Sequence, residues 1–238
     1  MTSDNLLALK GITKEYKEFR LGPLDLSVPR GYVMGLVGAN GAGKTTAIKI
    51  ALGAVLPGNG SAHLIDKTRV GVVLDQPCWQ ATWRVRDLSR LLGPFYPGWD
   101  QRVFDELCEW AGVSQRLKVR EFSRGMGMKV QVAVALAHRA ELLVLDEPTS
   151  GLDPLARSEL LDKLSEFMTD ERHSVLFSTH ITTDLDRMAD LVTILDAGRV
   201  IASGARDDLL EAWAMVRGGA ADLTGELRAR IRGLRQHS

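Results

Sequence analysis

The residues whose types and spacing most clearly suggest chemistry form a glycine-rich stretch, Gly38-Ala39-Asn40-Gly41-Ala42-Gly43-Lys44-Thr45. This stretch follows a continuous apolar run over residues 32–37 and precedes a segment expected to be helical over 44–52. Glycines allow backbone N–H groups to turn inward around phosphate oxygens, and a helix that begins there directs its positive end at the same charge. The pattern therefore predicts a phosphate-binding loop.

Two side chains in this loop have specific expected roles. Lys44 is expected to reach the outer phosphates of a nucleotide, in binding and in catalysis, and Thr45 to offer its hydroxyl to Mg²⁺, which prefers oxygen ligands. The alternative, a glycine turn with an incidental lysine, is disfavoured by the strand–loop–helix context. The nucleotide-binding residues predicted here are Gly38, Ala39, Asn40, Gly41, Ala42, Gly43, Lys44, Thr45 and Thr46.

A pair of carboxylates forms the second candidate group. Asp146 and Glu147 directly follow an apolar strand predicted over residues 142–145. In open α/β sheets, ligands bind in the crevice beyond such strand ends. We expect Asp146 to hold the water shell of a metal ion and Glu147 to orient or deprotonate an attacking water. Paired acids also occur in solvated turns, so this prediction depends on the phosphate-binding loop.

The elements that must position these residues are those of an α/β fold. Short apolar pieces over residues 6–28, broken at Gly22-Pro23, predict antiparallel strands joined by turns. Helical periodicity over 83–139 predicts a helical insertion. Strand, helix and strand then alternate over 142–178, with Asp153 as the expected N-cap of the helix. This alternation implies a parallel sheet.

Composition narrows the class of protein. The chain has 238 residues, 45% of them apolar, which suits one substantial core or one core with a small subdomain. The 30 basic and 30 acidic residues cancel. They give none of the broad positive field with which nucleic-acid binders gather phosphates. No apolar run approaches the roughly 18 residues that a membrane-spanning helix needs, and the start does not resemble a secretory signal.

Three further motifs add a resemblance to a known family. They are Phe122-Ser123-Arg124-Gly125-Met126, the run from Asp146 to Asp153, and Ser178-Thr179-His180. In order and spacing, together with the phosphate-binding loop, they resemble the ATP-binding subunits of ABC transporters over nearly the whole chain. The resemblance implies a P-loop NTPase cassette with a mostly parallel core sheet, an N-terminal antiparallel β subdomain, and a helical subdomain inserted between the Walker A and Walker B motifs.

The resemblance also implies how the chain is divided. It makes residues 1–238 a single ABC ATPase domain. Residues 1–75 and 140–205 would form the ATP-binding core, 76–139 the helical subdomain, and 206–238 a C-terminal helical tail.

Several site residues are assigned only by the resemblance. Tyr16 would stack on adenine, and Ser123, Arg124 and Gly125 would form the signature that caps the γ-phosphate held by the opposite subunit. Asp153 would belong to the loop that communicates between the two sites. His180 would be the switch residue that contacts the γ-phosphate, catalytic together with Glu147 and Lys44. The plainer alternatives are that Tyr16 is a strand core residue and His180 an ordinary loop histidine.

Two positions depart from the family pattern. The sequence LSGGQ appears here as Phe122-Ser123-Arg124-Gly125-Met126, so an arginine replaces a glycine and the final glutamine is absent. The loop that usually carries a metal-contacting glutamine has Asp75 at that place, followed by Gln76. Either residue could serve the metal. These variations resemble a bacterial exporter branch related to bacteriocin and antimicrobial-peptide export or resistance.

The function expected from the resemblance is ATP binding and hydrolysis that powers transport, with a tilt towards export. The cofactors would be ATP and Mg²⁺. The partners would be a membrane-spanning subunit and a second ATP-binding subunit, in a homodimer or a heterodimer, with no nucleic acid. The chain would lie on the cytoplasmic face of the membrane, held there by its partner. The alternatives are a non-transport ABC ATPase that acts on DNA or ribosomes and a regulatory module that binds ATP without turnover.

Two tryptophans directly after the Asp75-Gln76 loop leave another question open. Trp79 and Trp83 bring more apolar area than a solvated turn needs. They could help to form the groove that receives the membrane subunit, or they could pack inside the helical subdomain.

Overall fold

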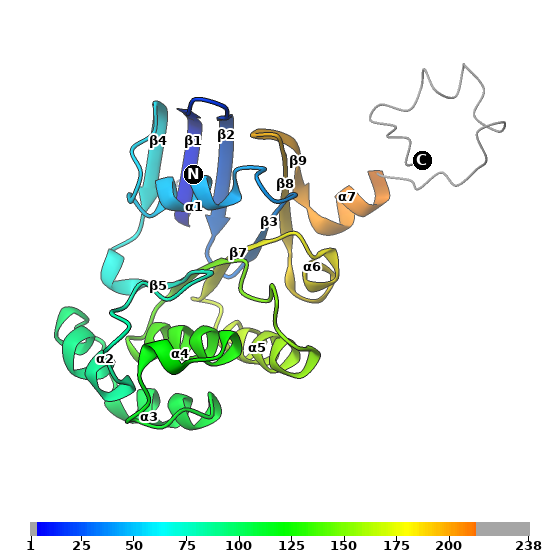
Figure 1. The fold of residues 1–238 in the computed structure, drawn as a ribbon. Helices are drawn as coiled ribbons and strands as arrows, with labels where there is room; N and C mark the ends of the chain where they lie inside the picture. The colour runs from blue at the N-terminus through cyan, green and yellow to red at the C-terminus, as the bar shows by residue number, and fades with distance from the viewer. Residues whose placement is uncertain (1–3, 213–238) are drawn as a thin grey trace, which may run out of the picture.

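The computed structural model describes residues 4–212, which form two β-sheets flanked by helices (Figure 1). The strands are β1 (Asn5–Glu15), β2 (Arg20–Pro29), β3 (Val33–Val37), β4 (Asn59–Leu64), β5 (Val70–Val73), β6 (Leu142–Asp146), β7 (Ser174–Thr179), β8 (Leu191–Asp196) and β9 (Arg199–Ala205). The α-helices are α1 (Lys44–Ala51), α2 (Val85–Leu92), α3 (Gln101–Trp110), α4 (Arg124–Ala137), α5 (Pro154–Phe167), α6 (Thr182–Met188) and α7 (Arg206–Ala212).

The larger sheet carries the edge at which the candidate residues gather. Its strand order is β5-β6-β7-β3-β8-β9, and every neighbouring pair is parallel except β8 and β9. All residues of β6 and β7 are buried, as expected for strands covered on both faces. Since β3, β6 and β7 are parallel, they end at the same edge, which places the segments after Val37, Asp146 and Thr179 together.

The smaller sheet packs against α1, the helix that follows the phosphate-binding loop. Strands β2, β1 and β4 are antiparallel and, in Figure 1, lie above β5 and β7 and beside β8 and β9 of the larger sheet. One apolar cluster includes Leu6 and Ile12 of β1, Ile48 of α1 and Leu176 of β7. The helix that begins in the glycine-rich loop is therefore packed into the core shared by both sheets.

A separate apolar cluster holds the helices α2, α3 and α4 together. It contains Val85, Leu88, Phe104 and Val130, and Figure 1 shows these helices below the larger sheet, with α4 beside α5. Trp79 and Trp83 are half-buried against this cluster, so both pack on the helical subdomain, and Trp79 also lines a cavity described below.

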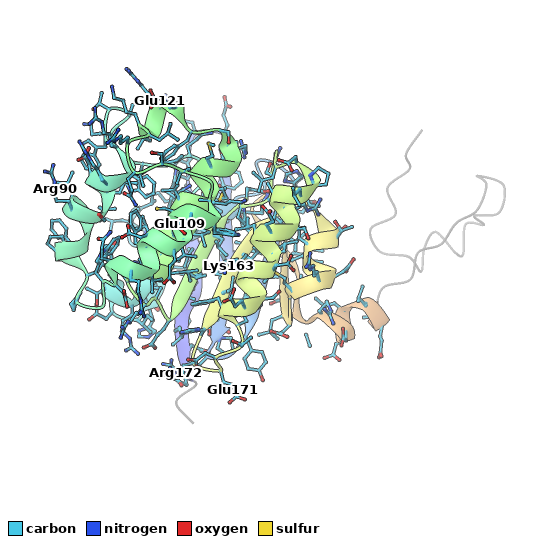
Figure 2. All side chains as sticks on the ribbon, turned by 90° about the horizontal axis from the view of Figure 1, so that it is seen from below. Arg90, Glu109, Glu121, Lys163, Glu171 and Arg172 are labelled. Atoms are coloured by element: carbon cyan, nitrogen blue, oxygen red, sulfur yellow. The ribbon has the colours of Figure 1, made fainter. Side chains whose placement is uncertain are left out.

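The outer faces of these helices are charged. Figure 2, which views the molecule from below, shows Arg90 of α2, Glu109 of α3 and Lys163 of α5 on this side. Arg90 and Glu109 are exposed. Polar outer faces and apolar inner faces are what helices packed on one side require.

Three local expectations need correction or limits. Gly22-Pro23 does not separate two strands but lies inside β2, because the chain turns earlier, at residues 16–19. Gly22 has a φ of 91° and the register of β1 and β2 shifts between Ile12 and Lys14, so an irregularity interrupts the strand without ending it. Strand β4 was not foreseen. Of the expected tail, α7 is described, and residues 213–238 lie outside the described part.

An ion-pair cluster lies where β5 and β6 begin, at the edge of the larger sheet opposite the candidate site. Glu141, directly before β6, accepts hydrogen bonds from Arg69 Nε at 2.7 Å and Arg30 Nη1 at 2.9 Å. Arg30 Nη1 also donates to the Arg172 carbonyl at 3.0 Å. Partial burial alone would raise the pKa of Glu141, but Arg69 and Arg30 together outweigh that effect and hold the pKa below its ordinary value. The cluster thus links β2, β5 and β6 electrostatically.

The free energy of unfolding should therefore depend on Glu141 in a pH-dependent way. A carboxylate whose pKa is lower in the folded chain stabilises it above the unfolded pKa of 4.5, and this contribution is lost as pH falls through the folded value. We expect Glu141→Gln to lower the free energy of unfolding by about 1–2 kcal/mol at pH 7 and by less at an acid pH well below 4.5, measured by urea denaturation. The exposed neighbour Glu171→Gln is the control. An equal effect at both pH values would contradict the assignment.

Candidate functional site

The glycine-rich loop is shaped by the close approach of its neighbours. Gly43 has a φ of 109°, and a Cβ at this position would lie 2.9 Å from both the Leu21 and Phe19 side chains. Only glycine combines this backbone conformation with this contact. Helix α1 begins at the next residue, Lys44, so its unpaired N–H groups face the loop.

The Lys44 ammonium lies inside the loop. Its Nζ donates to the carbonyls of Gly38 at 2.7 Å and Ala39 at 3.2 Å. It also lies 2.9 Å from Glu147 Oε1 in an ion pair that lacks hydrogen-bond geometry. The Lys44 side chain is only 5% exposed. The positive charge predicted to meet phosphates is thus compensated by the chain's own oxygens.

Glu147 connects this lysine to the predicted switch residue. Its Oε2 lies 2.7 Å from His180 Nδ1, so Lys44, Glu147 and His180 form one continuous line of contacts. Glu147 has a φ of 52°, a left-handed conformation that is unfavourable for a residue with a Cβ. Its N–H is held by Ser178, through the carbonyl at 3.2 Å and Oγ at 3.0 Å. His180 therefore has a specific partner in Glu147.

Asp146 holds the strand ends together. Thr45 Oγ1 and Ser178 Oγ each donate to one of its carboxylate oxygens at 2.7 Å. Asp146 is 4% exposed, and burying a carboxylate is costly unless its oxygens are paired. The predicted metal residues Thr45 and Asp146 are thus brought into direct contact. Ser178, which orders both acids, was not singled out from the sequence beyond its place in a motif.

A cavity of about 220 Å³ adjoins the loop. It is lined by Phe19, Asn40, Gly41, Gly43, Lys44, Thr45, Thr46 and Glu147. Phe19 was not predicted, because it stands in a polar turn with no motif around it. Tyr16 precedes it in the same turn, 48% exposed, with 6.4 Å between the two ring centroids. Tyr16 is therefore not a strand core residue.

The signature residues lie elsewhere. Ser123 is the N-cap of α4, and its Oγ accepts from Met126 N at 3.2 Å. Arg124 forms an ion pair with Asp75, and its Nε donates to the Ser150 carbonyl at 2.5 Å. Gly125 faces Ala156, which a Cβ at position 125 would meet at 3.7 Å, an ordinary contact.

A second cavity, of about 470 Å³, lies beside the signature. No residue lines both cavities. The second cavity is lined by Asp75, Gln76, Pro77, Trp79, Ala81, Val119, Arg120, Phe122, Ser123, Arg124, Gly127 and Met128. The structure therefore brings the two predicted groups of residues into different cavities, with Asp75 and Gln76 beside the signature.

A buried network that the sequence did not reveal supports the loop after Asp146. Asp184 of α6 is 1% exposed. It accepts from Thr149 Oγ1 at 2.6 Å and from Arg157 Nε of α5 at 2.7 Å. Asp153 caps α5 as predicted, with its carboxylate accepting from Leu155 and Ala156 N–H groups at 3.1 and 3.0 Å. The segments after β6 and β7 are thus joined through α5 and α6.

Comparison with known proteins identifies the family. A family model described as "ABC transporter" matches residues 21–150, more than half of the chain. The "Nod factor export ATP-binding protein I" of Cupriavidus pinatubonensis is 34% identical over 223 residues, which cover 87% of this chain and 68% of that protein. The "Bacitracin transport ATP-binding protein BcrA" of Enterococcus faecalis is 28% identical over 84% of this chain and 70% of that protein.

A solved structure shows the same fold. It is a dimeric ATP-binding cassette in a post-hydrolysis state bound to ADP and Pi, with a TM-score of 0.73 and 21% identity. The match covers 84% of this chain and 98% of that one.

The chain therefore belongs to the ABC transporter family. It is an ATP-binding subunit that hydrolyses ATP, and the predicted α/β cassette fold is confirmed. The alternative of an ATPase that acts on DNA or ribosomes finds no support in these relatives, which are named as transport subunits. Among the described residues, no helix is long and apolar enough to cross a membrane.

Proposed function

We propose that this subunit powers export of an amphiphilic compound through a separate membrane-spanning protein, by hydrolysing ATP at the site that contains Lys44, Glu147 and His180. The continuous contact of these three side chains at one sheet edge is the observation that carries the proposal. The relatives named for Nod factor export and bacitracin transport support the export of amphiphiles. The same proposal includes that the chain is one ABC ATPase domain, in which the ATP-binding core and the helical subdomain meet at residues 75/76 and 139/140.

The chemistry follows from what ATP must displace. Its phosphates enter the cavity beside Thr45 and pair with the Lys44 ammonium, which then no longer pairs with Glu147. Glu147 is freed to orient a water and accept its proton, and His180, released on the same side, contacts the γ-phosphate. Tyr16, exposed beside Phe19, offers its ring to adenine.

The residues present also suit Mg²⁺. Thr45 Oγ1 and an Asp146 oxygen already lie 2.7 Å apart, and both are oxygen donors of the kind this ion prefers. Bound there with ATP, the ion would neutralise phosphate charge. The ion pair with Arg124 engages Asp75, so Gln76 is the freer of the two residues proposed for the adjoining loop.

We further propose that the complete site needs two cassettes. Ser123 and Arg124 line a different cavity from the phosphate-binding loop, so a second copy related by a two-fold axis would supply them, with Gly125, to each ATP. The N-terminus of the 14-residue helix α4 suits an anion. The dimeric arrangement of the similar cassette supports this pairing.

The cavity beside the signature is the proposed docking groove for the membrane-spanning subunit. Pro77, Trp79 and Phe122 give it apolar walls, while Gln76 and Ala81 at its margin are exposed. A groove between the helical part and the core sheet would transmit movement of one relative to the other. Docking there would hold the chain peripherally on the cytoplasmic face of the membrane.

Substitutions in the proposed site should separate binding from hydrolysis. Lys44→Ala should lower turnover at least about 100-fold and weaken ATP binding, because the charge that meets the phosphates is lost. Glu147→Gln keeps the shape but cannot accept a proton, so it should bind ATP normally and lose about 10²–10⁴-fold in rate. Steady-state ATPase assays and nucleotide-binding titrations measure both. Parental turnover by Glu147→Gln would disprove the catalytic assignment.

Mixing two inactive variants should test the shared site. Lys44→Ala and Gly125→Asp should each be inactive. The second has room for its Cβ but places a carboxylate where the partner's γ-phosphate is proposed to lie. In a mixed dimer one site carries both lesions and the other carries none, so activity should partly return. No return in mixed dimers confirmed by differential tags would count against a homodimer with independent sites.

A charge in the docking groove should release the chain from its membrane partner. Ala81→Arg places a cation among Pro77, Trp79 and Phe122 and leaves the cavity beside the phosphate-binding loop unchanged. Membrane retention should fall several-fold in a sedimentation assay, with ATP binding by the free chain unchanged. Ala62→Arg, at another exposed alanine, in β4, is the matched control. Equal retention of both variants would refute this groove as the docking site.

A further inference from the structure

Arg124 joins three segments that come from distant parts of the chain. It is the first residue of α4, and its guanidinium contacts two loops that follow strands of the larger sheet. One nitrogen pairs with Asp75, which follows β5, and Nε donates to the Ser150 carbonyl, in the loop after β6, at 2.5 Å. The signature is thus tied by a single side chain to two loops that border the nucleotide edge.

The guanidinium is held more firmly than an ordinary surface pair. An isolated exposed ion pair contributes only about 0–1 kcal/mol, but Arg124 is 35% exposed and has two acceptors on separate loops. Gly151 also packs against the guanidinium. A Cβ at position 151 would lie 3.1 Å from Arg124 Nε, and the φ of 68° at this position suits glycine. A planar fork with fixed acceptors loses little freedom per bond formed.

Asp75 and a phosphate would compete for the same nitrogen atoms. A guanidinium paired with a carboxylate has its N–H groups directed at that carboxylate, and phosphate oxygens need the same groups. Asp75 and Arg124 are also two of the positions at which the chain departs from the family pattern, an acid for glutamine and an arginine for glycine. In this chain the two departures are in contact with each other.

We propose that Asp75 and Arg124 form a latch that holds the signature on the core of its own chain while ATP is absent. The latch must open before Arg124 can face the γ-phosphate bound by a second copy, a step that rests on the two-cassette site proposed above. Both residues are positioning residues in this scheme. Breaking the latch frees the signature, and its strength opposes assembly of the ATP-bound dimer.

Hydrogen exchange on the nucleotide-free chain tests the latch without ATP or a partner. In Asp75→Asn, backbone amides of residues 75–82 and 123–128 should exchange about three- to tenfold faster than in the parent. The control is Asp162→Asn, which breaks a pair with Arg187 of similar exposure on another surface. Exchange in the double variant Asp75→Arg/Arg124→Asp, which reverses the charges, should return towards parental values. Parental exchange in Asp75→Asn would overturn the latch.

Assembly provides the second readout. In a Glu147→Gln background, Asp75→Asn should lower the ATP concentration for half-maximal dimerisation about three- to tenfold, measured by size-exclusion chromatography with light scattering. An unchanged or higher value would overturn the role in opposing assembly, and a higher Mg²⁺ requirement would instead make Asp75 a metal contact. If both chains stay monomeric at saturating ATP, the two-copy site and the opposing role are both wrong, while exchange still decides whether the latch exists.

Discussion

The buried carboxylate of Asp146 is the constraint on which the site depends. Its two oxygens are each paired with a hydroxyl, that of Thr45 at the start of α1 and that of Ser178 near the end of β7. Ser178 Oγ in turn accepts a hydrogen bond from the Glu147 N–H. An unpaired carboxylate would be costly at this depth. These hydrogen bonds therefore hold together the ends of β6 and β7 and the start of α1, which follows β3. They fix the phosphate-binding loop, the proposed base and the metal donors relative to one another.

The elements around this centre differ in how strongly they are tied to it. The glycine-rich loop is packed between two sheets through α1 and Ile48. The signature is joined to the core by Arg124 and also by α4, whose Met128 and Val132 lie in the same apolar cluster as Leu143 of β6. Asp184 is fully enclosed between α5 and α6 and cannot easily separate from Arg157. The nucleotide edge is therefore held by buried hydrogen bonds, whereas the signature adds a partly exposed ion pair to its apolar packing.

Much of this arrangement was predictable from the sequence, for physical reasons that also explain the failures. The phosphate-binding loop and Asp153 were found because glycine conformations and helix caps are local signals. Strand β4 was missed because its residues are mostly exposed and polar, so no alternation marks it. Gly22-Pro23 was misread because a turn dipeptide can also sit in a strand irregularity. The contact of Asp75 with Arg124 joins residues 49 apart, and no local pattern encodes such a pairing.

The ion pair of Lys44 with Glu147 makes the phosphate-binding loop electrically self-compensated. A bare ammonium surrounded by helix N–H groups would attract any small anion. Here an incoming ligand must first replace a carboxylate and two carbonyl contacts already in place. A lone phosphate or sulfate gains few contacts in that exchange, whereas a triphosphate with a ring to stack gains many. The loop thereby discriminates by the number of groups a ligand presents, and common inorganic anions are kept from occupying the site between turnovers.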